Sequence, residues 1–287
     1  MPVCGWRYVS VNWLAEGNTA VITGGASGVG LAAARHYLSQ GMNVVAADKN
    51  SEAIAALEEE FAGVDRFAAQ SCDVADFADV LKLAQFTKER FGVVHCLMNN
   101  AGTMMAPSLP WENIEQWKQL IEINQWGIIH GCHAFLPDMI ASGQSGCVIN
   151  TGSKQGITNP PGGYAYNMSK AGVKAFTESL SHALREQGTT ITAHLLVPGF
   201  TYTGLIARFV KEQPPGAWTS EQVVEYMLDS LTAGDFYILC PDNDTPRELD
   251  ERRIQWQADD LIHNRPALSR WHPDWQDAYK SFEQQEK

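Results

Sequence analysis

Tyr166 and Lys170 have the residue types and the spacing of an acid–base pair. They lie four residues apart in a stretch that continues as AGVKAFTESLSHALREQG, so both side chains project from one face of a predicted helix. A nearby ammonium favours the phenolate and lowers the pKa of the phenol, which makes tyrosine usable in proton transfer near neutral pH. Such pairs are also common surface contacts on helices, so assigning a catalytic role to this pair depends on the residues around it.

Ser153 follows the apolar run GCVINT, which predicts a strand. The carboxyl ends of parallel strands form the edge at which open α/β sheets bind ligands, so the Ser153 hydroxyl could hold a substrate oxygen there. It is not the nucleophile of an acyl transfer, because the surrounding residues, TGSKQ, lack the Gly-x-Ser-x-Gly pattern of a nucleophile elbow. The alternative role is that of a helix or turn cap.

A glycine-rich turn, TGGASGVG from Thr23 to Gly30, lies between the predicted strand TAVIT and the predicted helix LAAARHYLSQG. Glycines permit a tight turn and let backbone amides approach a pyrophosphate at a helix N-terminus. The alternative is an ordinary strand-to-helix turn. Asp48 ends the next strand, where its carboxylate would accept hydrogen bonds from ribose hydroxyls and repel a 2′-phosphate. This favours NAD over NADP.

The elements that must position these residues alternate regularly along the chain. Short apolar runs near residues 20, 45, 95, 148, 193 and 237 are separated by amphipathic stretches, which predicts parallel strands joined by helices. We therefore expect an α/β fold with one doubly wound domain over residues 14–240. Residues 1–13 form an N-terminal extension, and residues 241–287 form a tryptophan-rich C-terminal extension that packs on the domain or on a second subunit. The segment 204–222 is either a lid or a surface connection.

The composition excludes several classes of protein. With 45% hydrophobic and 19% charged residues the chain can bury a large core, which excludes a disordered protein. A net charge of −12 disfavours nucleic acid and anionic lipid as partners. The N-terminus lacks the pattern of a secretory signal, and no run reaches the ~20 apolar residues of a membrane span. The six cysteines lie far apart, which predicts reduced core thiols and no metal site. We expect a cytoplasmic protein.

Taken together, these motifs resemble those of the short-chain dehydrogenase/reductase family, a group of NAD(P)-binding Rossmann folds. The resemblance runs from about Leu14 to Cys240 and rests on six motifs in order. They are Thr23-Gly24-x-x-x-Gly28-x-Gly30, Asp73-Val74, Asn99-Asn100-Ala101-Gly102, Asn124, the set Ser153, Tyr166 and Lys170, and Pro198-Gly199-x-x-x-Thr203. It implies a sheet of mostly seven parallel strands.

The resemblance also implies roles for individual residues. Tyr166 would be the general acid or base, Lys170 would lower the phenol pKa and bind the nicotinamide ribose, Ser153 would polarise the substrate oxygen, and Asn124 would support a proton-relay water. The residues expected to bind the cofactor are Thr23, Gly24, Ser27, Gly28, Val29, Gly30, Asp48, Asp73, Val74, Asn100, Ala101, Gly102, Tyr166, Lys170, Pro198, Gly199, Thr201 and Thr203.

Two positions depart from the family pattern. His95 stands where the family often has Asp, so we expect a local change of packing without loss of activity. The seventh strand, FYILC, lacks the Asp-Gly-Gly that often follows it and that forms a subunit interface in many relatives. A homodimer through the helices of Asn124 and Tyr166 is therefore favoured over a homotetramer.

The substrate lies outside the motifs. Apolar and aromatic residues flank the catalytic set in the sequence and suggest a bulky apolar or aromatic secondary alcohol or ketone, although core or lid packing is an equal alternative for each. They are Met104, Met105, Tyr164, Phe200, Tyr202 and Trp218. The tail after Arg265 distantly resembles dehydrogenases of benzylic alcohols in lignin-derived aryl ethers. Alternative functions are a 3-oxoacyl thioester reductase, which an acidic chain and Asp48 disfavour, and a non-catalytic NAD sensor, which the presence of Tyr166 and Lys170 disfavours.

Overall fold

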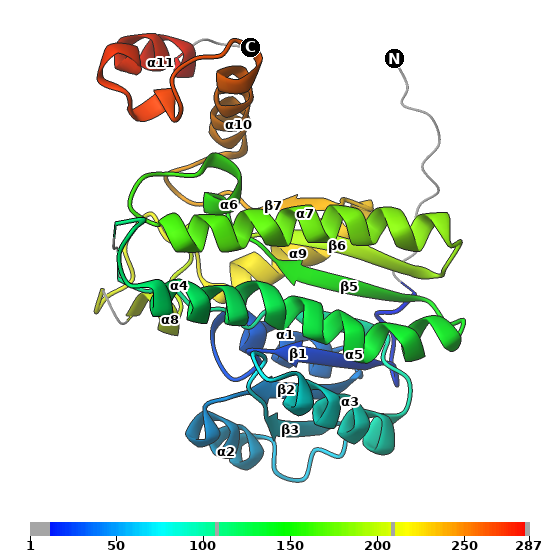
Figure 1. The fold of residues 1–287 in the computed structure, drawn as a ribbon. Coiled ribbons are helices and arrows are strands. Elements are labelled where there is room, and N and C mark those ends of the chain that lie inside the picture. The colour runs from blue at the N-terminus through cyan, green and yellow to red at the C-terminus, as the bar shows by residue number, and fades with distance from the viewer. Residues whose placement is uncertain (1–11, 107–108, 208–209, 285–287) are drawn as a thin grey trace.

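A computed structural model describes residues 12–106, 109–207 and 210–284. Seven strands form one parallel sheet in the order β3-β2-β1-β4-β5-β6-β7 (Figure 1). Their bounds are β1 Thr19–Thr23, β2 Asn43–Asp48, β3 Phe67–Ser71, β4 Cys96–Asn99, β5 Gly146–Thr151, β6 Ile191–Val197 and β7 Tyr237–Leu239. From β1 the chain adds strands in one direction to β3, and from β4 it adds strands in the other direction to β7. The crossovers after β1 and β4 therefore lie on opposite faces of the sheet, and a topological switch point lies between these two strands. The predicted fold class is confirmed.

Helices cover both faces of the sheet. Three of them share an apolar core cluster on one face: α1 Gly28–Ser39, α2 Ser51–Glu60 and α9 Ser220–Ala233. Three others share the cluster on the opposite face: α3 Phe77–Phe91, α5 Gly127–Ala141 and α7 Tyr164–Glu186. In Figure 1 α5 and α7 run across the face turned toward the viewer. The central strands β1, β4, β5 and β6 are mostly apolar because both of their faces are buried.

The period of two residues along each strand explains this division. In β1, Ala20 and Ile22 belong to the first cluster and Val21 belongs to the second. All three are fully buried. The sheet is therefore held from both sides, and its carboxyl edge has a fixed geometry on which loops can carry functional groups.

The helix preceding α5 is irregular. The segment from α4, Ile114–Ile121, to α5 contains a π-helical turn, Glu122–Trp126, which holds Asn124. Turns of this type often occur at functional sites because they re-aim one side chain without ending the helix. Two short helices, α6 Gln155–Thr158 and α8 Gly204–Ala207, follow β5 and β6 at the same edge of the sheet.

The C-terminal extension projects away from the sheet (Figure 1). It consists of α10 Arg247–Ile262, the turns η2 Ser269–Trp271 and η3 Pro273–Trp275, and α11 Gln276–Glu283. Its centre is Trp256, which is 4% exposed and packs against Trp275, Tyr279 and Phe282. The guanidinium of Arg265 lies 4.0 Å from the Trp256 ring centroid. The tryptophans thus pack within the extension, while docking of the extension on a second subunit remains a prediction.

Several sequence expectations concern this framework. The five cysteines in the described part of the chain are buried and free, as core thiols would be; Cys4 lies outside the described residues, as does most of the predicted N-terminal extension. His95 Nδ1 accepts a hydrogen bond from the Thr19 amide at 3.1 Å, and its Nε2 lies 2.7 Å from Gln144 Oε1; a change of packing relative to the family stays a prediction. Within the described residues, no helix is both long and apolar enough to cross a membrane.

Candidate active site

The glycine-rich turn is closely packed against the loop after β4. The Thr23 hydroxyl accepts hydrogen bonds from the backbone amides of Asn100 and Ala101, at 3.0 and 3.1 Å. Gly24 and Gly28 have φ of +63° and +53°, and a Cβ on Gly24 would lie 2.8 Å from Ala101 Cα. A Cβ on Gly30 would lie 2.2 Å from the Gly24 carbonyl oxygen. Only glycine fits these positions.

The first turn of α1 meets the requirements of an anion site. Ser27 occupies the N-cap position without a side-chain capping bond, and the first turn contains no acidic residue. The amides of this turn and the positive end of the helix dipole therefore face the carboxyl edge without a competing carboxylate. These residues fit the pyrophosphate of a dinucleotide. A Cβ on Gly28 would lie 3.2 Å from the Thr203 side chain, so the loop after β6 reaches this turn.

Two carboxylates and one apolar residue lie further along the same edge. Asp48 ends β2, and its Oδ1 accepts a hydrogen bond from the Asn50 amide at 3.0 Å. Asp73 follows β3, and its Oδ1 accepts a hydrogen bond from the Ala75 amide at 3.0 Å. The neighbouring Val74 is buried, 6% exposed, against Gly127 of α5, where a Cβ would lie 2.7 Å from Val74 Cγ2. The roles of these residues at an adenosine site stay predictions.

Ser153, Tyr166 and Lys170 come together at the end of β5. The side chains of Tyr166 and Ser153 lie close enough for the serine to oppose the rise of the phenol pKa. The Lys170 side chain is buried, with its Nζ 5.8 Å from the Tyr166 ring centroid and donating to the Thr151 carbonyl oxygen at 2.8 Å. Helix α7 thus places the phenol and the ammonium on one face, as their spacing predicts.

Desolvation dominates the electrostatics of this group. Burial raises the pKa of Tyr166 above its ordinary value, and the contact with Ser153 opposes that rise without reversing it. The lowering of the phenol pKa by Lys170 stays a prediction. Burial also lowers the pKa of Lys170 to about 8. An ammonium held by one carbonyl oxygen fits a site that receives further oxygen acceptors, such as ribose hydroxyls.

Asn124 is fully buried beside the catalytic set. Its Oδ1 accepts from the Thr103 amide at 2.8 Å, and its Nδ2 donates to the Thr103 carbonyl at 2.9 Å and to Ser169 Oγ at 3.1 Å. A Cβ on Gly102 would lie 3.4 Å from Asn124 Oδ1 and 3.5 Å from Lys170 Nζ. Gly102 therefore brings the loop after β4 to the point where Asn124 and Lys170 meet.

The comparisons with known proteins agree with this geometry. The family described as short chain dehydrogenase matches residues 18–214. A 3beta-hydroxysteroid dehydrogenase 2 of Eggerthella lenta is 33% identical over 197 residues, 68% of this chain and 75% of its own. An NADP-dependent (R)-specific alcohol dehydrogenase of Lentilactobacillus kefiri is 30% identical over 194 residues, 67% and 76% of the two chains. A short chain dehydrogenase/reductase of Burkholderia phymatum, solved in complex with NAD, superimposes with a TM-score of 0.79 at 29% identity and covers 88% and 96%.

The chain belongs to the short-chain dehydrogenase family. The family assignment made from the sequence is confirmed, and with it the reaction class: a dehydrogenase or reductase that acts on CH–OH groups with a nicotinamide cofactor. Alcohols are the substrates named for the two curated relatives given above. The choice between NAD and NADP differs among these proteins, so it is not decided by family membership.

The predicted substrate residues of this short-chain dehydrogenase form two groups. The first, Trp218 and Tyr202, makes contacts that fix a loop, and the second, Phe200, Met104 and Tyr164, is partly exposed at the sheet edge. Trp218 packs against Tyr226 and donates from Nε1 to Asn243 Oδ1 at 3.1 Å, and the Tyr202 hydroxyl donates to the Lys211 carbonyl at 2.8 Å. These contacts hold the segment between β6 and α9 in place. Phe200 is 40% exposed beside the site. Met104 and Tyr164 are half-buried, in the loop after β4 and at the start of α7.

The loop after β6 carries the remaining predicted cofactor residues. Pro198 and Gly199 leave β6, and the Thr201 hydroxyl donates to the Gly199 carbonyl oxygen at 3.1 Å. Thr201 also pairs with Trp218 in a β-bridge. Within the predicted lid, residues 208–209 lie outside the described part of the chain. Lid movement remains a prediction.

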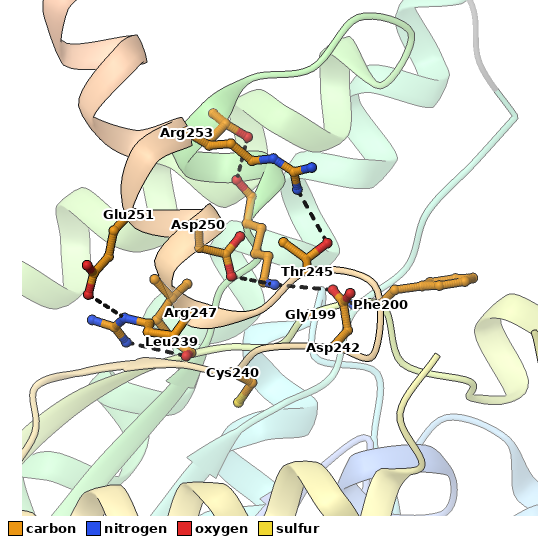
Figure 2. A network of polar contacts seen from close by, with 12 residues as sticks. Gly199, Phe200, Leu239, Cys240, Asp242, Thr245, Arg247, Asp250, Glu251 and Arg253 are labelled. Carbon is orange, nitrogen blue, oxygen red and sulfur yellow. Dashed lines mark hydrogen bonds and ion pairs between the residues drawn. The ribbon is translucent and has the colours of Figure 1, made fainter. Parts of the chain in front are cut away.

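Sequence reasoning missed a polar cluster behind Ser153. Lys154 Nζ lies within ion-pair distance of Asp242 and Asp250, which come from the segment after β7 and from α10. Figure 2 shows Asp242 and Asp250 beside Phe200 and Thr245. The sequence held one signal for this cluster, a lysine inside a predicted turn, but it held no sign of the two distant carboxylates.

Proposed function

We propose that this chain is an NAD-dependent oxidoreductase that interconverts a secondary alcohol and a ketone, with Tyr166 as the general acid/base. The observation that carries the proposal is that Ser153 and Tyr166 meet at the end of β5 beside the buried Lys170 ammonium, which the Thr151 carbonyl oxygen holds. A hydroxyl pair of this kind can hold one substrate oxygen and exchange its proton. Relatives named as alcohol dehydrogenases support the reaction type.

The cofactor site would be built from the residues that fit each part of a dinucleotide. The amides of the glycine turn and the N-terminus of α1 bind the pyrophosphate. Asp48 accepts hydrogen bonds from the adenosine ribose and repels a 2′-phosphate, which favours NAD over NADP. Asn100, Thr203 and Lys170 hold the nicotinamide ribose and carboxamide end. A nicotinamide held by these residues would supply the hydride acceptor for alcohol oxidation and the hydride donor for ketone reduction.

The chain's own residues would transfer the proton between the substrate and solvent. Ser153 donates a hydrogen bond to the substrate oxygen and fixes its distance from Tyr166. In alcohol oxidation Tyr166 accepts the hydroxyl proton, and in ketone reduction it returns one. Lys170 stabilises the phenolate that oxidation requires, and its own partner, the Thr151 carbonyl, holds it in place. Asn124 would support the water chain that exchanges this proton with solvent.

The substrate would be bulky and apolar or aromatic. Phe200 is 40% exposed at the site, Met104 comes from the loop after β4 and Tyr164 comes from the first turn of α7, at the same sheet edge. A relative named for a hydroxysteroid supports a large alicyclic alcohol as one member of the test panel. Specificity in such sites comes from loops of this kind on a constant framework.

The test is a panel of secondary alcohols, aliphatic, alicyclic, steroidal and aryl, assayed with NAD and with NADP by nicotinamide absorbance, using wild type beside Tyr166→Phe. We expect turnover with NAD to exceed turnover with NADP. Tyr166→Phe should lose about 100-fold or more in turnover, because it lacks the transferable proton, while NADH affinity is retained. Equal turnover in the two proteins would contradict the role of Tyr166. NADH binding without turnover on any substrate would favour a sensor.

A homodimer through α5 and α7 completes the proposal. A shallow groove between these helices is lined by Ile128, Ile129 and Phe176. Two large apolar side chains at this face are well exposed in the single chain, Trp126 at 46% and Met168 at 45%. Pairing with a second copy would remove them from water.

A further inference from the structure

Lys154 directly follows Ser153, and its ammonium ends between two buried carboxylates. Its Nζ lies 3.2 Å from Asp242 Oδ2 and 2.6 Å from Asp250 Oδ2. The side chains of both aspartates are 6% exposed and that of Lys154 is 17% exposed. One ammonium thus forms ion pairs with two buried carboxylates that lie close to each other. Removing it would leave both without this shared partner, which is far more costly inside a protein than at its surface.

Asp242 connects Lys154 to the loop after β6. Its Oδ2 also accepts a hydrogen bond from the Phe200 amide at 3.0 Å (Figure 2). The backbones touch as well, since a Cβ on Gly199 would lie 2.7 Å from the Pro241 carbonyl oxygen and 2.8 Å from Asp242 Oδ2. The same carboxylate oxygen therefore holds the turn of Ser153 and the first residues of the 198–203 loop. These are the two segments that flank the proposed reaction centre.

Asp250 connects the same ammonium to the C-terminal extension. It lies in the first turns of α10, where the neighbouring Arg253 donates to Thr245 Oγ1 at 3.3 Å and Arg247 donates to the Leu239 carbonyl at 3.4 Å (Figure 2). These bonds fix the start of α10 to the segment after β7. Helix α10 also contacts α6, which begins one residue after Lys154.

On its other side the Ser153 turn packs closely against α7. The Gln155 amide donates to Ser153 Oγ at 3.2 Å, and the Gly156 amide donates to the Ser153 carbonyl at 3.0 Å. A Cβ on Gly156 would lie 2.5 Å from the Lys170 backbone carbon. The turn is thus pressed between α7 and the Lys154 ion pairs. Loosening the ion pairs would shift Ser153 relative to Tyr166.

We propose that Lys154 and Asp242 hold Ser153 in position against the 198–203 loop, and that the ion pair of Lys154 with Asp250 connects α10 to this arrangement. The inference rests on the proposed function, in which Ser153 holds the substrate oxygen and the loop contacts the cofactor. Lys154 is a positioning residue, because it acts through Ser153 and Phe200 and not on the substrate itself. The C-terminal extension would then influence turnover through one buried ion pair.

The kinetic test compares Lys154→Met, Asp250→Asn, the double variant Lys154→Met/Asp250→Asn and wild type. Lys88→Met is the matched control, because it breaks an ion pair with Asp138 that is exposed on both sides. We expect Lys154→Met to lower kcat about 10-fold to 100-fold while KM for the alcohol changes by less than about 3-fold, since small displacements of a positioned group chiefly affect the chemical step. Asp250→Asn should give a smaller loss of kcat, and Lys88→Met none.

The double variant separates positioning from folding. It removes one of the carboxylates that Lys154→Met leaves without its partner, so it should regain most of the stability lost in Lys154→Met while kcat stays low. Recovery of kcat along with stability would show that Lys154 only supports folding, and would overturn the proposal. So would a Lys154→Met variant with the kcat of Lys88→Met.

Hydrogen–deuterium exchange gives a readout that does not require turnover. In Lys154→Met and in the double variant we expect faster exchange in peptides covering 152–158 and 198–203, with β1 and β4 unchanged. In Asp250→Asn the increase should lie at the start of α10. Unchanged exchange in both loops would overturn the positioning role even if no alcohol in the panel is a substrate, so this arm distinguishes failure of the inference from failure of the proposed function.

Discussion

Lys170 combines deep burial with one hydrogen bond to the described part of the chain. The residue is 4% exposed, and its Nζ donates to the Thr151 carbonyl oxygen. Burial lowers its pKa from 10.5 to about 8, so at pH 7 the side chain is still a charged ammonium. The folded state therefore includes the free-energy cost of removing this charge from water. A pKa lowered on folding means that the folded state binds this proton less tightly than the unfolded chain. The residue therefore opposes folding below pH 8, and this opposition fades as the pH rises from 8 toward 10.5.

We therefore expect Lys170→Met to stabilise the cofactor-free protein at pH 7 while it abolishes turnover. A shift of this size corresponds to about 3 kcal/mol, from which the lost hydrogen bond to Thr151 is subtracted, leaving a net gain of about 1 to 2 kcal/mol. Urea unfolding at pH 7 and at pH 9.5 checks this, with Lys88→Met as control. The gain should shrink at the higher pH. A variant less stable than wild type at both pH values would show that the ammonium is well solvated in solution.

At the residue scale, the sequence predicts groups that share a short motif and misses groups that meet only in the fold. Ser153, Tyr166 and Lys170 come together as their spacing predicts, because one helix and one strand end place them. The Lys154 cluster could not be predicted, since Asp242 is 88 residues away and no periodicity connects the two. The pKa direction of Tyr166 was also out of reach, because it depends on desolvation by neighbours that only the three-dimensional structure reveals.

At the scale of elements, the close approach of α5 to the sheet depends on glycine. A Cβ on Gly131 would lie 2.1 Å from Asn99 Oδ1, and Asn99 is a buried residue of β4 whose Nδ2 donates to Asn150 Oδ1 at 2.9 Å. The Asn99 amide would have to turn or α5 would have to retreat. Alternating strands and helices in the sequence predict the sheet well, but they do not reveal which helix face approaches it so closely.

We expect Gly131→Ala to destabilise the protein by about 1 to 2 kcal/mol, because overpacking and the disturbed Asn99 pair outweigh the helix propensity gained from alanine. The matched control is Gly204→Ala in α8, where an added Cβ meets nothing within 4 Å. This control should be neutral or slightly stabilising. Urea midpoints of the two variants decide the matter: if both move equally, the contact with Asn99 is not responsible.

At the scale of the whole molecule, the chain has a sheet domain packed on both faces and a separate aromatic cluster in its C-terminal extension. The Trp256 cluster stabilises the extension internally, where the Trp256 Nε1 donates to Ser269 Oγ at 2.7 Å and the Asp260 carboxylate accepts from Arg265 at 2.9 Å. Beyond this cluster, Leu261 is 84% exposed and Ile262 is 67% exposed. The sequence indicated an extension from its composition, but not that the tryptophans would pack on one another. The first turns of α10 join the domain through Asp250, so the extension and the Ser153 turn share the ammonium of Lys154.

The proposed dimer provides the last prediction. Met168 lies in α7 and is 45% exposed at the α5–α7 face, so a carboxylate placed there would lose its hydration on pairing without gaining a cationic partner. We expect wild type to sediment at twice the 31.6 kDa chain mass and Met168→Asp to dissociate at least about 10-fold more readily, which corresponds to about 1.4 kcal/mol. Leu81→Asp, at a residue of α3 that is 46% exposed, is the matched control and should leave the dimer intact. Sedimentation velocity over a concentration series measures both variants. If Leu81→Asp dissociates the dimer and Met168→Asp does not, the subunits meet through another face, and Trp126 and Met168 face solvent or another partner in the assembled enzyme.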